Sequence, residues 1–239
     1  MKLIEYFDRA CVIHLPERTD RYEALQRELR PLGMSLTDPK VRIPFAPRPD
    51  DAHGYTSRGV FGSFLSHYNI LKEALADGIQ SVWVLEDDAI FSRKMVRDQE
   101  RLVETLRANP WDLCFFGHSL TTELEGVPKG LVHHGAPFRW AHCYAVHARI
   151  LPRLIAYLDE TMARPVGHPE GGKVYIDAAY SLFRKLNPDV VSLVANPVLS
   201  LQKGCYSSLG GGHWYDRSRV TRPLVSVARS ARDELWRRT

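Results

Sequence analysis

The pattern of apolar and polar positions alternates between strand-like and helix-like segments from the start of the chain. The run Ala10–Leu15 is apolar enough for a buried strand. Downstream of it, apolar residues recur at helical spacing and stop before Gly33, a residue that commonly ends helices. The apolar positions of this predicted helix are Tyr22, Leu25, Leu29 and Leu32. The first unit is therefore predicted to be strand, loop, helix.

A second helix is predicted immediately before the most apolar strand of the chain. Its apolar residues are spaced by four, three and four positions, namely Phe64, Tyr68, Leu71 and Leu75. Ser63 or Ser66 is available as its N-cap, and Gly78 is a suitable stop. The segment 82–85, with the letters VWVL, then has the β-branched and aromatic character of a buried strand.

The remaining pattern extends the same alternation and predicts the fold class. Segments 111–117, 141–147 and 190–194 are strand-like, and the apolar spacing over 151–162 is helical. Alternating strands and helices favour an α/β domain with a single, mostly parallel sheet flanked by helices. The stretches 121–139 and 163–173, rich in Gly, Pro and His, are predicted to be long loops, either plain connections or acceptor-binding segments.

Three adjacent acids, Glu86, Asp87 and Asp88, follow the 82–85 strand. Like charges this close repel, so either they face water or a positive group lies among them, and a divalent cation is the strongest such partner. Ligands of open α/β sheets bind beyond the carboxyl ends of the strands, which is where these acids fall. On an extended chain Glu86 and Asp88 would share one side; a turn would change that assignment.

The length and the distribution of charge suggest one domain followed by a basic tail. The chain has 239 residues, 44% of them hydrophobic, and a formal net charge of +4. Arginines and apolar residues interleave at the end, so residues 1–215 are expected to form the domain and 216–239 an amphipathic tail. The tail either packs on the domain as a helix or contacts an anionic membrane surface; nucleic acid is not an expected partner.

The sequence also predicts a cellular location. The N-terminus lacks a long apolar leader, and no run is long and apolar enough for a membrane span. The four cysteines are far apart and form no CxxC pair, which favours reduced, mostly buried thiols. We therefore expect a cytoplasmic protein, with peripheral contact to the inner face of the membrane if the tail binds lipid.

Five segments of the chain form a recognisable set: VIHLPERTDR at 12–21, RGVFGSFLSHYNILKEAL at 58–75, VLEDDAIF at 84–91, YIDAAYSLF at 175–183 and NPVLSLQKGCYSS at 196–208. In their order and spacing they resemble glycosyltransferase family 25, which includes lipooligosaccharide and collagen sugar transferases. The chain departs from the family pattern at three points: His14 stands where the family usually has Asn, Phe61–Ser63 stand where a Gly-Cys pair is common, and no acidic residue follows the paired serines.

The resemblance implies a GT-A type nucleotide-diphospho-sugar transferase in which a short acidic motif holds Mn²⁺ or Mg²⁺ against the donor. Asp88 and Glu86 are the implied metal ligands, with Asp87 as the alternative and Glu86 and Asp87 also facing the donor. A cation fixed there would stabilise the charge that the diphosphate gains as the sugar leaves. Further donor contacts are implied at Leu15, Arg18, Arg21, Ser66 and His67.

Two further residues are candidates by position. Asp177 matches the family's late aspartate and is the candidate base for transfer with inversion; the alternative is a helix N-cap. His142 and His147 are weaker candidates for the base. His213, in the segment LGGGHWYD, is a candidate third metal ligand on a glycine-rich segment, and the alternative is a linker before the tail.

The expected function is metal-dependent, inverting transfer of a hexose, with galactose as the candidate, from a UDP-sugar to a surface glycan such as lipopolysaccharide or lipooligosaccharide. Two alternatives remain open. Acids at a strand end also suit a Mg²⁺-dependent nucleotidyl- or phosphotransferase. A chain of this kind can also be a non-catalytic scaffold that binds nucleotide sugar.

Overall fold

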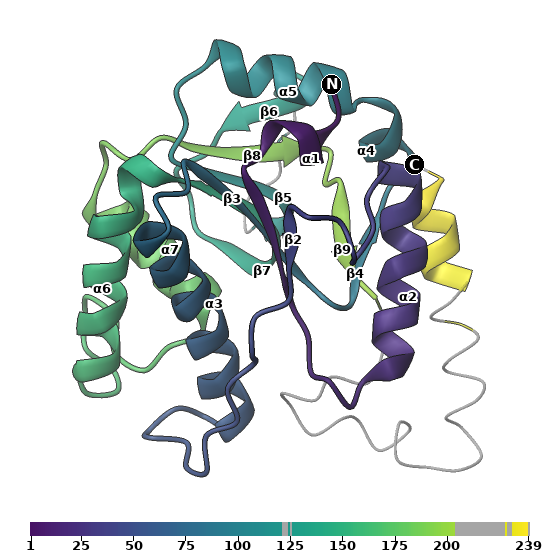
Figure 1. The fold of residues 1–239 in the computed structure, drawn as a ribbon. Helices are drawn as coiled ribbons and strands as arrows, with labels where there is room; N and C mark the ends of the chain where they lie inside the picture. Colours follow the sequence, from purple (N-terminus) through teal and green to yellow (C-terminus); the bar gives the residue numbers. More distant parts are fainter. Residues whose placement is uncertain (121–123, 125, 204–227, 229–230, 239) are drawn as a thin grey trace.

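The computed structural model describes residues 1–120, 124, 126–203, 228 and 231–238. Over these residues the chain folds into one sheet covered by helices on both faces (Figure 1). The strands are β1 Arg9–Ile13, β2 Val41–Arg42, β3 Ser81–Glu86, β4 Ala89–Phe91, β5 Leu113–Leu120, β6 Gly130–His133, β7 Phe138–His147, β8 Ser192–Asn196 and β9 Ser200–Gln202.

Most strands of the sheet point in one direction. The order is β2-β1-β3-β7-β5-β8-β6, with β4 pairing β9 and β9 also pairing β5. Strands β1, β2 and β3 are parallel, and β5 and β8 are parallel to each other. Strand β7 lies between β3 and β5 and runs antiparallel to both, so these two groups share one direction. The predicted α/β class and mostly parallel sheet are confirmed.

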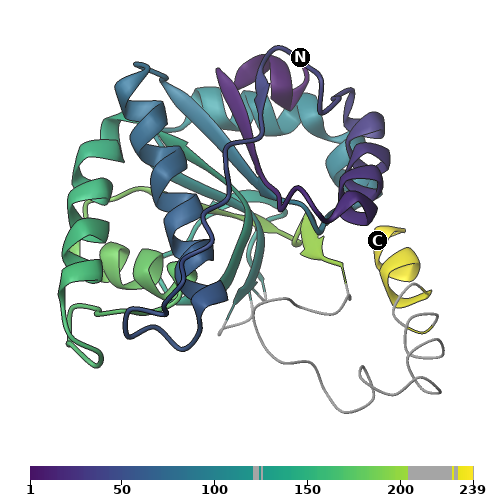
Figure 2. The same ribbon diagram turned by 60° about the horizontal axis from the view of Figure 1, so that its bottom comes forward.

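The helices form two layers, one on each face of the sheet (Figures 1 and 2). Helices α3, α6 and α7, with the short η2, pack on one face, and α1, α2, η1, α4 and α5 cover the opposite face. The helical segments are α1 Leu3–Tyr6, α2 Thr19–Leu29, η1 Arg30–Leu32, α3 Arg58–Ala76, α4 Arg93–Arg97, α5 Gln99–Ala108, η2 Ala148–Ile150, α6 Leu151–Ala163 and α7 Ile176–Leu186.

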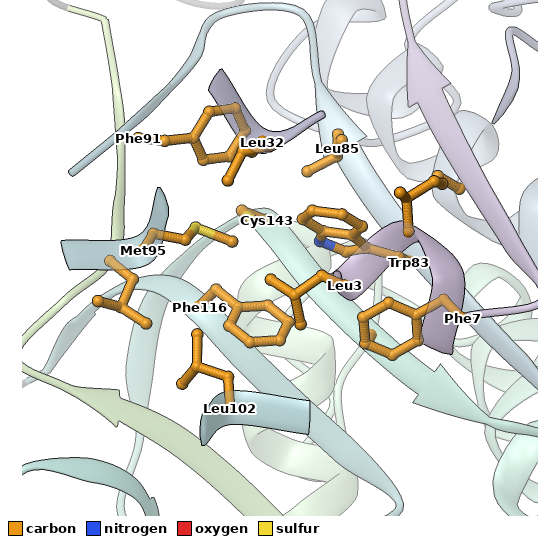
Figure 3. Packing of buried hydrophobic residues seen from close by; sticks show 14 of the residues in the cluster. Leu3, Phe7, Leu32, Trp83, Leu85, Phe91, Met95, Leu102, Phe116 and Cys143 are labelled. Atoms are coloured by element: carbon orange, nitrogen blue, oxygen red, sulfur yellow. The ribbon is translucent and has the colours of Figure 1, made fainter. Parts of the chain in front are cut away.

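The strand that carries the acids is fixed by an aromatic core. On the α1 face, Trp83 of β3 packs against Phe7 and Phe116, with ring centroids 5.6 and 6.0 Å away (Figure 3). All three side chains are fully buried. Large buried aromatic surfaces contribute strongly to stability, so this cluster holds the end of β3 in place.

Helix α3 begins earlier than the sequence pattern predicts. Ser57 is its N-cap and accepts a hydrogen bond from the Val60 amide at 3.2 Å; the predicted caps Ser63 and Ser66 lie inside the helix. The buried Val60, four positions before Phe64, continues the apolar period to the true start, but Gly59 and Gly62 in the same turns weaken the helical signal. Gly33 and Gly78 were the residues predicted to end helices. Both have the left-handed backbone typical of that position, with φ of 73° and 66°.

The predicted loop 121–139 was wrong in part. Strand β6 lies inside it and pairs antiparallel with β8, and β7 begins at Phe138. Four residues, Gly130 to His133, are too few to show a clear alternation. The predicted connection 163–173 between α6 and α7 is confirmed as a loop.

The described end of the tail is helical over residues 231–237 and lies beside α2 in both views (Figures 1 and 2). There the Arg237 guanidinium contacts a Glu28 carboxylate oxygen at 2.6 Å. This contact is what the packing interpretation predicts, although Leu235 is 67% exposed. Among the described residues, none of the helices combines the length and the apolar composition that a bilayer crossing requires.

Three of the cysteines, Cys11, Cys114 and Cys143, are buried free thiols, as predicted. The fourth, Cys205, lies outside the described residues.

Candidate active site

A cleft of about 550 Å³ lies beyond the carboxyl ends of β1 and β3. The two strands are parallel and in register at Ile13 and Glu86, so the residues that follow them meet at one edge of the sheet. The cleft is lined by the ends of these strands, α2, the loop 46–50, the first turns of α3 and the end of β9.

The acidic segment turns immediately after β3, so the extended arrangement is wrong. Glu86 ends β3, and β4 already begins at Ala89. The Asp87 amide donates to the Ile13 carbonyl at 3.1 Å, and the Lys203 amide donates to the Asp88 carbonyl at 2.7 Å. These backbone bonds fix the turn between β1 and the end of β9, and each acid acquires its own surroundings.

Asp87 is the most enclosed of the three acids. Its carboxylate lies 2.9 Å from His14 Nδ1 and 2.7 Å from an Arg21 nitrogen. The same Arg21 nitrogen lies 3.1 Å from Asp88 Oδ2. Arg21, on α2, is therefore a positive group among the acids, and it explains how Asp87 is accommodated when only 6% exposed.

Asp88 differs from the other two acids in the hydrogen bonding of its carboxylate. Within the described part of the chain its buried Oδ1 has no hydrogen-bond partner. Burial, and then the negative charge of Glu86, raise the pKa of Asp88 to about 7, because Arg21 compensates for them only in part. A carboxylate left in this condition at the wall of a cleft is suited to receive a cation.

Glu86 is held from two sides at the bottom of the cleft. Gln202 Nε2 donates to its Oε2 at 2.9 Å, and His67 Nε2 lies 3.4 Å from its Oε1. Burial raises the pKa of Glu86, but His67 and Gln202 outweigh it and leave the pKa below its ordinary value. Glu86 therefore remains charged beside Asp88.

His67 connects Glu86 to the interior through two tyrosines. Its Nδ1 lies 2.9 Å from the Tyr144 hydroxyl, which lies 2.7 Å from the Tyr180 hydroxyl. All three side chains are buried. The chain Glu86–His67–Tyr144–Tyr180 thus joins the end of β3 to α3, β7 and α7, and it orients the Glu86 carboxylate.

The side of α3 that faces the cleft carries small residues. Gly59, Gly62, Ser63 and Ser66 all line it, and the Ser66 hydroxyl donates to the Gly62 carbonyl at 2.8 Å. A side chain at Gly62 would meet the Pro47 carbonyl oxygen at 2.8 Å, so glycine lets the loop 46–50 approach the helix. Small residues here leave room for a ligand along the helix.

The predicted donor contacts fall into two groups. Leu15, Arg21, Ser66, Glu86, Asp87 and Asp88 line the cleft, and His67 lies behind Glu86. Arg18 is not among the lining residues: its guanidinium makes two 2.9 Å bonds to the exposed Asp20 carboxylate. Sequence reasoning missed two parts of the site: Gln202, which lies in the family-like segment 196–208 but was given no role, and the loop 46–50, which no motif marks.

Asp177 lies near the start of α7 and is not among the residues that line the cleft. The N-cap alternative is wrong, because the N-cap is Tyr175. The Asp177 oxygens accept hydrogen bonds of 2.8 Å from the Ala178 and Trp140 amides. The role of Asp177 as a base remains a prediction.

The other predicted residues contribute less. His142 is fully buried, and burial lowers its pKa to about 4; its ring nitrogens have no hydrogen-bond partner within the described ranges. His147 follows at the far end of β7 and accepts from the Arg149 amide. His213 lies outside the described residues.

A divalent cation would have to be held by few protein groups. No cluster of three or more His, Cys, Asp or Glu side chains suited to a metal occurs among the residues that the structure describes. Mg²⁺ commonly uses one or two carboxylates and takes its other oxygens from substrate phosphates and water. The spare oxygen of Asp88, next to a charged Glu86, fits that pattern.

Comparison with known proteins agrees with the geometry. The sequence profile described as glycosyltransferase family 25 (LPS biosynthesis protein) matches residues 33–118. The human protein named inactive glycosyltransferase 25 family member 3 is 32% identical over 173 residues, which are 63% of this chain and 29% of that protein. Zebrafish procollagen galactosyltransferase 1 is 33% identical over 129 residues, 46% of this chain and 21% of that protein.

This chain therefore spans less than a third of the length of these relatives. Among solved structures, a glycosyltransferase involved in the glycosylation of the major capsid of PBCV-1 superposes with a TM-score of 0.51 at 11% identity, covering 95% of this chain and 98% of that one. At that identity the likeness concerns the fold alone. The profile match and the sequence relatives identify the chain as a relative of glycosyltransferase family 25.

Proposed function

We propose that this protein is a metal-dependent glycosyltransferase that moves a hexose from a UDP-sugar to a glycan acceptor, with inversion at the sugar carbon. The observation that carries the proposal is the acidic turn at the end of β3. It presents Asp88, with a spare oxygen, and a charged Glu86 to a cleft of nucleotide-sugar size. The family relationship favours sugar transfer over other uses of such a turn.

The cleft offers separate groups for the parts of a donor. Asp88 and Glu86 would hold Mn²⁺ or Mg²⁺, and that cation would offset the charge that builds up on the departing diphosphate. Arg58, in the first turn of α3, lines the same cleft, and its guanidinium is available to phosphate oxygens. Arg21 and His14 hold Asp87 and so keep the turn in its position.

Inversion requires a base that takes the proton of the attacking acceptor hydroxyl. Asp177 is the candidate, on the α7 side of the molecule. Each of its oxygens accepts one backbone hydrogen bond, which leaves a further lone pair for the acceptor proton.

The proposal extends to the acceptor and to the cellular location. The profile's description names LPS biosynthesis, and we propose a surface glycan of the lipopolysaccharide or lipooligosaccharide kind as acceptor and galactose as the sugar. Synthesis of such glycans on a membrane surface suits a cytoplasmic enzyme with a basic tail.

A screen of UDP-hexoses by thermal shift, with and without Mn²⁺, tests the proposal. A ligand that binds only the folded protein raises its melting temperature by mass action. We expect a shift that requires both UDP-sugar and Mn²⁺, together with release of UDP when acceptor is added. Turnover of a nucleoside triphosphate with sugar phosphate would instead indicate a nucleotidyltransferase. A shift with no turnover for any acceptor would indicate a binding scaffold.

A further inference from the structure

One stripe of α7 holds the backbone that leads into β7. Arg184 donates to the His134 carbonyl and, at 3.2 Å, to the Ala136 carbonyl. Ser181 bonds both the amide and the carbonyl of Phe138, each at 3.2 Å. Asp177 then accepts from the Trp140 amide at 2.8 Å. Three side chains at helical spacing therefore fix the segment 134–140 in one position.

This fixed segment ends in a bulge at Trp140. Strand β5 advances two residues from Gly117 to Ser119 while β7 spans four, from Cys143 back to Arg139. Trp140 lies in the extra stretch with φ of 69°, a left-handed conformation that costs a residue with a side chain about 1–2 kcal/mol. Bulges of this kind redirect a side chain and are common beside active sites.

The bulge presents the indole to solvent. Trp140 is 43% exposed although it is the largest side-chain type, and its ring lies 6.4 Å from the buried His142 ring. Tyr175, two residues before Asp177, is 50% exposed. Two exposed aromatic residues are thus tied to Asp177, one through its backbone amide and the other by lying two residues earlier in the chain. The Trp140 indole meets the His142 ring at an edge, and this contact leaves much of the indole open to a ligand.

The two aromatic residues lie at the side of the cleft. The last paired residues of β3 and β7 are Leu85 and Cys143, and the strands are antiparallel, so Trp140 lies at the end where the acidic turn leaves β3. The Tyr175 hydroxyl accepts from Thr56 Oγ1 at 3.2 Å, next to Ser57, which lines the cleft. The aromatic pair therefore borders the cleft on its α7 side.

We infer that Trp140, with Tyr175, is the platform on which the accepting sugar ring stacks, and that Asp177 holds the platform in place. The apolar C–H face of a hexopyranose matches an exposed indole, while its hydroxyls suit the Asp177 carboxylate, which is hydrogen-bonded to the Trp140 amide. The inference rests on the proposed function, because the cleft beside the platform is the site assigned to the donor.

Binding of simple sugars tests the platform without knowledge of the natural acceptor. Methyl β-D-galactopyranoside and methyl β-D-glucopyranoside are titrated against the full chain and observed by saturation-transfer NMR. We expect saturable binding of at least one, with the strongest transfer to its C–H face. Trp140→Gly relieves the left-handed backbone, so the variant should fold, and it should bind the sugar about tenfold more weakly or worse. Trp140→Tyr should restore most of the affinity.

Leu186→Ala is the matched control, an exposed apolar residue at the other end of α7 that should leave sugar binding unchanged. The Mn²⁺-dependent thermal shift by UDP-hexose should be the same in Trp140→Gly and in the unaltered protein. Unchanged sugar binding in Trp140→Gly, or no saturable binding of either glycoside to the unaltered protein, would overturn the platform. Absence of any donor-induced shift in the unaltered protein would instead overturn the proposed function.

Discussion

Asp88 determines how the acidic turn responds to pH. Its pKa, raised to about 7 in the fold, lies above the ordinary 3.8. Between these values the folded protein keeps a proton that the unfolded chain has released, so stability falls as pH rises from about 4 to about 7. The charged Asp88 carboxylate therefore lowers the free energy of unfolding, and it places a negative charge in the cleft.

Replacement of that charge should stabilise the protein. We expect Asp88→Asn to raise the free energy of unfolding at pH 7.5 by roughly 1 to 4 kcal/mol, since an uncompensated buried charge is removed. The difference from the unaltered protein should shrink to nearly zero below pH 4, as measured by urea unfolding across pH. Glu104→Gln, at an exposed position on α5, is the control and should change little. A destabilised Asp88→Asn at pH 7.5 would refute this electrostatic account.

Asp177 has two possible functions, and kinetics distinguishes them. As the base, it supplies a step that only turnover senses, so Asp177→Asn should keep donor affinity and lower the turnover number roughly a hundredfold or more. As a residue that only holds Trp140, it would raise the KM for acceptor and leave turnover at saturation intact. Initial rates with acceptor varied at saturating donor decide between the two results.

At the scale of elements, the hydrogen bonds that join His67 to Tyr144 and Tyr144 to Tyr180 are the feature with the clearest energetic consequence. Tyr144→Phe removes the central hydroxyl and leaves His67 Nδ1 and the Tyr180 hydroxyl buried without that partner. We expect a loss of about 1–3 kcal/mol in unfolding free energy. Tyr55→Phe is a matched control: its buried hydroxyl has no hydrogen-bond partner in the described part of the chain. Its removal should be neutral or slightly stabilising, and an equal loss in both variants would contradict the role of these hydrogen bonds.

The sequence predicts a helix or strand well where its burial imposes a regular spacing of apolar residues. Strand β3 is apolar from Val82 to Leu85 because both of its faces are covered, and α6 shows its spacing because one face packs on the sheet. The start of α3 escaped prediction, although the buried Val60 continues its apolar period, because the cleft side of the same turns carries glycine and serine, which are poor or indifferent helix formers. Strand β6 escaped because it is short.

From the sequence, the site could be predicted only where its functional residues are adjacent in the chain. Glu86, Asp87 and Asp88 mark the cleft because three acids at a strand end need an explanation. Their separate roles depend on the turn and on Arg21, a contact between residues 66 positions apart. Gln202 and Tyr144 become visible only once β9 and β7 are placed beside β3.

At the scale of the whole molecule, the tail is the part whose role is still to be measured. Arg237 and Glu28 form an ion pair in which both side chains are largely covered, 25% and 19% exposed. Glu28→Gln should therefore lower the unfolding free energy by about 0.5–1 kcal/mol, measured by urea unfolding at low salt, with a smaller effect at high salt. No change at low salt would mean that the tail does not pack on α2 in solution.

Vesicle sedimentation tests the other role of the same tail. If residues 216–239 bind anionic lipid, the intact chain should sediment with phosphatidylserine-containing vesicles and be released as salt is raised. Removal of the residues after Arg222 should then abolish sedimentation. No sedimentation of the intact chain would leave packing on α2 as the function of the tail.

The central claim is that Asp88 places a cation against a nucleotide-sugar donor, and a Mn²⁺ titration of UDP release tests it most directly. UDP released from UDP-galactose is measured in the presence of glycan acceptor for the unaltered protein and for Asp88→Asn. We predict saturable activation by Mn²⁺ in the unaltered protein and a loss of roughly a hundredfold or more in the variant, since several kcal/mol of charge stabilisation is removed. UDP release that is independent of Mn²⁺, or equal in Asp88→Asn, would contradict the account.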